Sequence, residues 1–168
     1  MKNLYYITIL LILLIVIAGC SYSFYMSAYP YLETIKITEF KNETDQYDLE
    51  IEIIEYMSNI FNSENRLRTV DINPDAELSG KVINYESDNI IDFDKNQLVE
   101  QYELKITFSL VFTDLVNNQV LWQSDNLTIS EQYYPNSEEQ TITTEQQARD
   151  EIFSKLYDKL IKNTLEKW

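Results

Sequence analysis

The sequence contains no histidine, a single cysteine and only two glycines among its 168 residues. Without histidine and with one thiol, it lacks most nucleophile–base pairs and most zinc or copper ligand sets. With so few glycines it has no phosphate-cradling loop. One cysteine cannot form an intramolecular disulfide, so the fold has to be held together by its core alone. We therefore expect no cofactor and no enzymatic activity.

Basic residues are also scarce, with 13 Lys and Arg against 28 Asp and Glu and a formal net charge of −15. This charge argues against nucleic-acid partners, which need clustered cations facing phosphate. A disordered chain is a poor alternative, because the 45% hydrophobic and 13% aromatic content is ample for a packed core. The 13 tyrosines either serve at an interface or reflect an AT-rich genome.

The N-terminus carries an apolar run, Leu4–Ala18, that ends at Gly19 and Cys20. Its length is typical of a signal-peptide hydrophobic region and short for a spanning helix, which needs roughly 20 residues. The small residues before the cysteine resemble the bacterial lipoprotein lipobox. That resemblance implies cleavage after residue 19 and a diacylglyceryl group on Cys20. The alternative is an uncleaved helix with a buried thiol.

Ser21, where Asp would suggest retention at the inner membrane, favours the outer membrane, with the protein facing the periplasm.

The mature chain is predicted to consist of a lipidated, extended tether, residues 20–32, and a single domain, residues 33–168. Alternating polarity predicts strands, and apolar residues three and four apart predict helices. The predicted strands are 33–40, a short one at 67–71, 76–87, 102–112 and 119–130; the predicted helices span Leu49–Phe61 and Ala148–Trp168. The fold class expected is α+β, a two-layer sandwich with two helices on one face of a mostly antiparallel sheet of about four strands.

Short motifs in the sequence predict where these helices and strands begin, end or turn. Asn, Thr and Asp residues before the first helix can each supply its N-cap, and "NSENR" (62–66) is expected to end it. Asn73-Pro74 and Asn117-Asn118 predict turns, the second within a hairpin. Gly80 predicts either a bulge or a close backbone approach. The segment 131–140 is predicted to be a polar loop.

The best metal candidate is "DFDKNQLVEQYE", in which Asp92, Asp94, Asn96 and Glu103 approach the spacing of a calcium-binding loop. Gln97 stands where such a loop needs glycine, and a strand rather than a helix follows. A plain loop between strands is therefore the preferred interpretation. The remaining carboxylates lie at polar positions of helices and strands, as on a solvated face, although a paired-carboxylate hydrolase stays an alternative.

The order of these pieces resembles the LPS-assembly lipoprotein family LptE. The matching stretches are "CSYSF", "LETIKITEFKNETDQYDLE", "AELSGKVINYES", "EQYELKITFSLVFTDLVNNQVLW" and the closing helix. Members of the family run similarly from a lipidated cysteine through an "F-x-N-x-T" turn into a helix, an "A-x-L-x-G" strand and a hairpin carrying "VLW". The resemblance covers nearly the whole mature chain.

The resemblance implies a non-enzymatic, lipid-anchored outer-membrane protein that acts as partner and plug of the β-barrel LptD in lipopolysaccharide insertion. Some members bind lipopolysaccharide through basic residues on a strand-turn region, where this sequence offers Lys81, Lys95 and Lys105 among many acids. These lysines are either lipopolysaccharide ligands or ordinary surface residues. The alternative function is a lipid-anchored periplasmic ligand-binding or envelope-scaffold protein without a barrel partner.

Overall fold

The computed structural model of the chain describes residues 28–38, 40–135, 137 and 139–166. The predicted signal peptide and Cys20 lie outside the described residues, as does Trp168. Within them, the chain forms six strands and two helices. In chain order these are β1 Thr34–Ile37, β2 Lys41–Asn42, α2 Leu49–Ser63, β3 Arg68–Thr69, β4 Ala76–Phe93, β5 Val99–Asp114, β6 Gln119–Tyr133 and α3 Glu145–Asn163.

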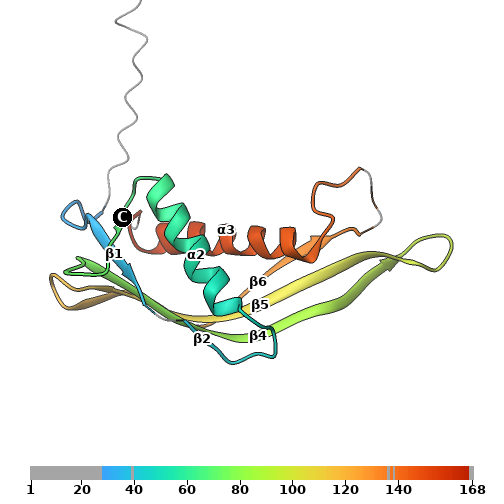
Figure 1. Ribbon diagram of the computed structural model, residues 1–168, viewed down its shortest axis with the longest axis horizontal. Coiled ribbons are helices and arrows are strands. Elements are labelled where there is room, and N and C mark those ends of the chain that lie inside the picture. Colours follow the sequence, from blue (N-terminus) through green and yellow to red (C-terminus); the bar gives the residue numbers. More distant parts are fainter. Residues whose placement is uncertain (1–27, 39, 136, 138, 167–168) are drawn as a thin grey trace, which may run out of the picture.

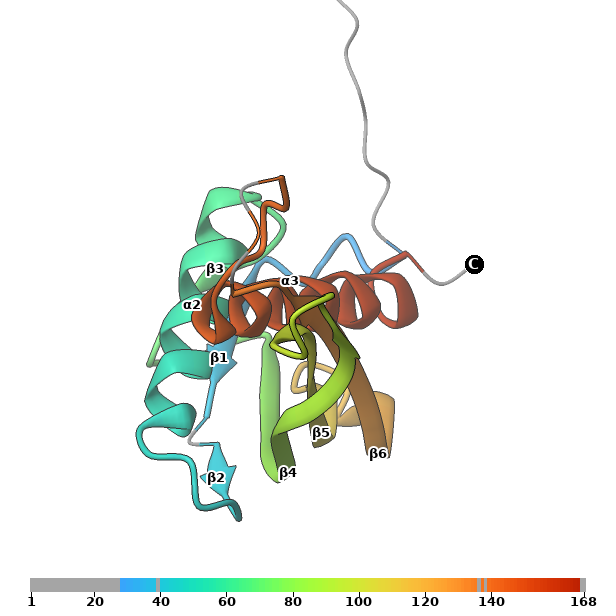
Figure 2. The same ribbon diagram turned by 90° about the vertical axis from the view of Figure 1, so that its right-hand side faces the viewer.

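The two helices cover one face of a curved sheet and leave the other face open, as Figures 1 and 2 show from two sides. The predicted α+β class and the two-layer arrangement of helices on a sheet are therefore confirmed. The prediction of about four mostly antiparallel strands is wrong. The six-stranded sheet is mixed and runs β3-β1-β4-β5-β6, with β2 pairing β4 separately.

The parallel part of the sheet has a topological cause. A strand followed by a crossover helix returns parallel to the first strand, and α2 is the crossover between β1 and β3. Accordingly β1 pairs in parallel with β3 and with β4, and β2 pairs in parallel with β4. Sequence periodicity missed β2 because a two-residue strand has no period to detect, and it did not indicate that β1, β2 and β3 pair in parallel.

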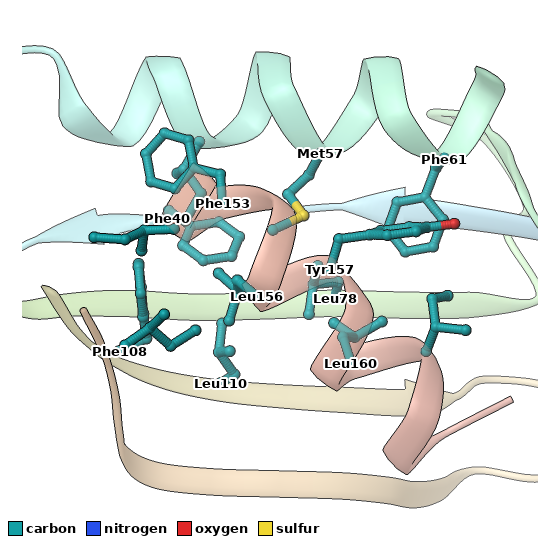
Figure 3. Close-up of a cluster of buried hydrophobic side chains, with 14 of the residues drawn as sticks. Phe40, Met57, Phe61, Leu78, Phe108, Leu110, Phe153, Leu156, Tyr157 and Leu160 are labelled. Atoms are coloured by element: carbon teal, nitrogen blue, oxygen red, sulfur yellow. The ribbon is translucent and has the colours of Figure 1, made fainter. Parts of the chain in front are cut away.

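The long hairpin of β4 and β5 supplies most of the core. On β5 the even-numbered residues from Leu104 to Asp114 are buried and alternate with half-exposed ones, the pattern of an antiparallel strand with one dry face. Figure 3 shows these side chains meeting the helices, with Phe108 and Leu110 from β5 below Phe153 and Leu156 from α3. Phe61 of α2 meets Tyr157 of α3 edge to face, with ring centroids 5.0 Å apart.

Gly80 marks a close backbone approach rather than a bulge, which decides between the two alternatives predicted for it. It pairs in register with Leu110, and a Cβ added there would lie 2.7 Å from Leu110 Cδ2 and from Phe40 Cε1. The irregularities of β4 come further along, the first between Val82 and Asn84. Phe40, from the "F-x-N-x-T" turn, thus packs directly on the glycine of "A-x-L-x-G".

The predicted turns are confirmed, with one correction at the start of α2. Asn73 and Asn118 both adopt positive φ, as turn asparagines do. Asp48 holds the N-cap position of α2, but it has φ 59° and its side chain makes no capping hydrogen bond. The side chain of Asn42, six residues earlier, makes the hydrogen bonds that hold this turn together. Its Oδ1 accepts hydrogen bonds from the Thr44 amide and hydroxyl, at 3.0 and 2.7 Å.

Several boundaries differ from the sequence-based predictions. The last helix, α3, runs from Glu145 to Asn163 rather than from Ala148 to Trp168. β4 continues to Phe93, six residues beyond the predicted end, and β6 continues to Tyr133, into the segment predicted as loop. The described part of the tether is a turn rather than an extended segment, since the Leu32 amide donates to the Tyr29 carbonyl at 3.1 Å. In the described ranges, no helix is both long and apolar enough to cross a membrane.

Candidate interaction surfaces

The N-terminal segment is bonded to the ends of β4 and β5, where it defines one end of the molecule. Tyr31 Oη donates to Asp114 Oδ2 at 2.5 Å, and Asn117 Nδ2 donates to both of these oxygens at 2.9 Å. Asp114 is fully buried. Burial raises the pKa of its carboxyl, but the hydrogen bonds from Tyr31 and Asn117 outweigh burial and hold the pKa below its ordinary value.

A second carboxylate reinforces this attachment. Asp75 Oδ2 accepts hydrogen bonds from the Thr34 hydroxyl at 2.7 Å and from the amides of Thr34 and Glu33 at 2.9 and 3.1 Å. The hydrogen bonds from Thr34 and Glu33 lower the pKa of Asp75. The chain that leads toward Cys20 is therefore fixed to the sheet by two ionised carboxylates, one at the start of β4 and one at the end of β5.

Apolar side chains gather around this end. The turns that carry them lie together in Figure 1, next to the point where the described chain begins. A backbone hydrogen bond of 2.8 Å from Leu115 to Asp75 joins the loop before β4 to the β5–β6 turn. Five apolar residues at this end are between 39 and 79% exposed. We name these residues the proximal patch: Tyr31, Ile72, Leu115, Val116 and Val120.

The opposite end is the tip of the β4–β5 hairpin, which Figure 1 shows projecting beyond α3 and β6. Its turn is internally braced by Asp94. The Asp94 Oδ1 atom accepts hydrogen bonds from the amides of Asn96 and Leu98, both at 2.8 Å, and these bonds hold the pKa of the Asp94 carboxyl below its usual range. The Asp94 carboxylate thus supplies the side-chain hydrogen bonds that define the conformation of this turn.

This hairpin tip carries four exposed apolar residues, which we name the distal patch: Ile90, Ile91, Phe93 and Leu98. These side chains are 48 to 61% exposed, and no helix of the described chain covers them. Acids flank the patch, namely Asp88, Asp92, Asp94 and Glu100, while Lys95 is the one basic residue between them. An apolar centre with an acidic rim is suited to a protein surface more than to an anionic lipid headgroup.

The three lysines predicted as lipopolysaccharide ligands are spread along the sheet. Lys81 and Lys105 lie on the open face, each with a glutamate: Lys81 Nζ is 3.1 Å from Glu43 Oε1 and Lys105 Nζ is 3.3 Å from Glu103 Oε2. Lys81 pairs in register with Ser109, so it stands four residues, about 13 Å, from Lys105. Lys95 lies further off, in the hairpin tip.

This separation weakens the case for one shared phosphate site, because exposed cations bind phosphate well only when several converge. Lipopolysaccharide binding by Lys81, Lys95 and Lys105 stays a prediction. Lipid attachment at Cys20 also stays a prediction, since the residue lies outside the described part of the chain.

The segment 92–103, weighed as a calcium-binding loop in the sequence, forms the tip of the β4–β5 hairpin. It is the connection between strands that was the preferred interpretation. The Asp94 carboxylate is engaged by its own turn, and Asp92 Oδ1 accepts the Phe93 amide at 2.8 Å. Glu103 lies in β5 beside Lys105. In the residues that the structure describes, no group of three or more His, Cys, Asp or Glu side chains is placed to hold a metal ion.

A buried ionic network that the sequence did not indicate joins both helices to β4. Arg149 of α3 is only 7% exposed. Its Nε lies 2.8 Å from Glu52 Oε2 of α2, and its Nη1 donates to Tyr85 Oη of β4 at 2.8 Å. Tyr85 in turn donates a hydrogen bond to Glu145. Burial, followed by the hydrogen bond to Glu145, raises the pKa of Tyr85. The one feature of the sequence that could have indicated this network is the position of Arg149, which falls within the apolar stripe of α3.

Carboxyl groups do not show the electrostatics of a general acid. A paired-carboxylate hydrolase needs one carboxyl with a raised pKa. Among the described carboxyl groups, those with a clear pKa shift all shift downward through hydrogen bonds; they are Asp75, Glu86, Asp94 and Asp114. What the described surface offers is two groups of exposed apolar residues and a polar sheet face.

Comparison with solved structures agrees with this class of fold. The hypothetical protein CT253 from Chlamydia trachomatis is similar with a TM-score of 0.57 and 7% identity, over 78% of this chain and 96% of that one. Protein XCC0632 from Xanthomonas campestris gives 0.51 and 10%, over 79% and 85%. At these identities the likeness concerns the fold alone. A comparison with curated proteins finds no significant match.

The family is established by sequence. Residues 32–164 match the family model described as LptE, lipopolysaccharide-assembly. This span includes both helices and every strand of the described sheet. The chain therefore belongs to the LptE family, as the motifs "F-x-N-x-T" and "A-x-L-x-G" predicted.

Proposed function

We propose that this protein is a lipid-anchored, non-enzymatic component of lipopolysaccharide assembly at the outer membrane. In this proposal Cys20 carries the lipid, the domain faces the periplasm, and an LptD-like β-barrel is the partner that it plugs. The observation that carries the proposal is the LptE family match over residues 32–164.

The surface of the protein supports a protein partner more than direct capture of lipopolysaccharide. Lys81 and Lys105 each have a glutamate within 3.3 Å, and the net charge of −15 repels phosphate. The distal patch, in contrast, combines a pre-braced turn with exposed apolar side chains. A rigid loop loses little conformational entropy on binding. The proposal therefore assigns the distal patch to the barrel.

Co-purification tests this function. The tagged full chain, with its own signal peptide, is expressed in its native host and isolated from detergent-solubilised outer membranes. The expected result is recovery of an LptD-like barrel in stoichiometric amount. Recovery of the chain without any such barrel would count against the proposal and favour the scaffold alternative.

A variant pair then tests the surface. Phe93→Ser with Leu98→Ser should reduce barrel recovery at least several-fold, because it removes the apolar centre of the distal patch. The matched control is Tyr47→Ser with Ile51→Ser, which removes two side chains of comparable or greater exposure near the start of α2. The control should leave recovery unchanged. Equal recovery with both double variants would show that the distal patch is not the barrel contact.

A further inference from the structure

The proximal patch lies at the end of the molecule from which the chain leads to Cys20. Ala28, the first described residue, is fixed there by a 2.7 Å hydrogen bond from its amide to the Leu165 carbonyl. Cys20 lies eight positions before Ala28, a distance of at most about 28 Å even for a fully extended chain. If Cys20 is embedded in a leaflet through its acyl chains, this end of the domain is therefore the end held near the lipid surface.

The composition of the patch matches such a surface. Valine, leucine and isoleucine side chains exposed on tight turns can enter the boundary between headgroups and acyl chains. Tyr31 adds an aromatic ring whose hydroxyl is already bonded to Asp114 and Asn117. Tyrosine is favoured where one end of a side chain is apolar and the other is polar.

Charge at this end selects the kind of lipid. The nearest carboxylates, Asp75 and Asp114, are occupied by hydrogen bonds within the protein. Asp71 is exposed next to Ile72, and Arg68 is the exposed cation on the neighbouring β3. With local charges of both signs and an overall charge of −15, an anionic surface would repel the domain, whereas a zwitterionic surface would not.

We propose that the proximal patch is a second membrane contact, which rests on a zwitterionic lipid surface and orients the domain relative to its anchor. This inference rests on the proposed lipidation of Cys20. Two points of attachment, an acyl anchor and an apolar protein surface, restrict the tilt of the domain. The distal patch, at the other end of the long hairpin, then lies at the end of the domain farther from the anchor.

The single cysteine makes a site-specific test straightforward. Once Cys20 is lipidated its sulfur is in a thioether, so Val116→Cys or Leu98→Cys introduces the only free thiol of the mature chain. Each lipidated full-length variant is labelled with an environment-sensitive fluorophore and reconstituted alone into phosphatidylcholine vesicles. Quenching is then measured with a nitroxide lipid and, separately, with aqueous iodide.

The expected result is several-fold stronger quenching by the nitroxide lipid at position 116 than at position 98, with the reverse order for iodide. Equal quenching at both positions, or strong nitroxide quenching at 98 alone, would overturn the proposal. Protection of position 116 from both quenchers would also overturn it, because a second copy of the chain would then cover the patch. Val120→Cys repeats the test if Val116→Cys fails to fold.

The mass of the mature chain separates this inference from the proposed function. A mature chain that begins at Cys20 without a lipid would refute the proposed anchoring, and the membrane contact with it. A lipidated chain whose position 116 stays accessible to iodide would refute the contact alone. Recovery of the barrel in the co-purification experiment is independent of either outcome.

Discussion

At Gly80 the backbone of β4 passes so close to Phe40 and to β5 that no side chain fits. An added Cβ would lie 2.8 Å from the carbonyl oxygen of Ser109, which is part of the sheet and cannot turn away. Phe40 is 1% exposed and fills the space that the glycine leaves. The family motifs "F-x-N-x-T" and "A-x-L-x-G" therefore describe the two sides of one contact in the core.

Gly80→Ala should reduce the free energy of unfolding by about 1–3 kcal/mol, because the methyl group overpacks this contact. Urea denaturation followed by circular dichroism measures the change. The neighbouring Ser79→Ala, where a side chain already fits, is the control and should stay within about 0.5 kcal/mol of the unmodified chain. A stable Gly80→Ala variant would contradict the close approach.

Arg149 is the second residue on which the fold depends, because it is a buried charge that links three elements. Arg149→Met should cost about 2–4 kcal/mol of unfolding free energy by leaving Glu52 and Glu145 without their cation. Lys159→Met, on the exposed side of the same helix, should cost little. In a double-mutant cycle, adding Glu52→Gln should recover part of the loss. Purely additive effects would mean that the ion pair contributes nothing.

At the scale of elements, the β4–β5 hairpin is longer than the layer that covers it. Its inner half is buried under the helices, and its outer half, from about residue 86, carries three register shifts. Bulges bend and twist a strand, which discourages edge-to-edge pairing with other chains. At the tip the apolar side chains are exposed, and the hydrogen bonds to Asp94 rather than core packing stabilise the turn.

Asp94→Ala should therefore loosen the tip while leaving the core intact. Amide hydrogen exchange at Asn96 and Leu98 should accelerate, and global stability should fall by no more than about 1 kcal/mol, since a few exposed hydrogen bonds are lost. Lys95→Ala, in the same turn, is the control and should leave the exchange of both amides unchanged. Unchanged exchange in Asp94→Ala would show that the carboxylate does not brace the turn.

At the scale of the whole molecule, the segments that carry the two apolar patches lie at opposite ends of the sheet, and the helical layer lies between them (Figure 1). The end near the tether depends on Asp75 and Asp114, whose pKa values are both lowered. A lowered carboxyl pKa means that the folded state favours the ionised form. The resulting stability is present above the unfolded pKa of about 4 and is lost as the pH falls through the folded values.

Acidification below about pH 4 should thus release the N-terminal segment from the sheet. Limited proteolysis with pepsin, or the NMR signals of residues 28–34, should report this release before the core unfolds. Tyr31→Phe removes one hydrogen bond to Asp114, so its release should begin at a higher pH than in the unmodified chain. Identical acid profiles for the two chains would contradict the role of Tyr31.

Sequence patterns predicted the parts of this fold that follow from local chemistry. The 3.6-residue period placed α2 and α3, the strict alternation from Tyr102 to Phe112 placed β5, and Asn118 marked its turn. The hairpin turn predicted the pairing of β5 with β6, but the other pairings could not be predicted, because periodicity gives the faces of a strand and not its neighbours. The turn from Asn42 to Asp48 was only half predicted, since several side chains competed for the cap.

The candidate sites also include some that the sequence predicted and some that only the fold revealed. The sequence named Cys20 and three lysines, but only the fold set Lys81 and Lys105 about 13 Å apart along the sheet and gave each a glutamate. The distal patch was not predictable, because Ile90, Ile91 and Phe93 look like core residues until the helices are seen to end short of them. Arg149 was not singled out in the sequence, because its burial depends on contacts with α2 and β4, which lie far from it along the chain.

By itself the sequence determined the class of this protein, its helices and long strands, and its membership of the LptE family, because composition, periodicity and motif order are local properties. Only the tertiary structure decided the mixed sheet, the close approach at Gly80 and the placing of exposed apolar side chains at two opposite ends. These depend on which segments distant in sequence come into contact, and that is fixed by burial of the whole core rather than by any single stretch of chain.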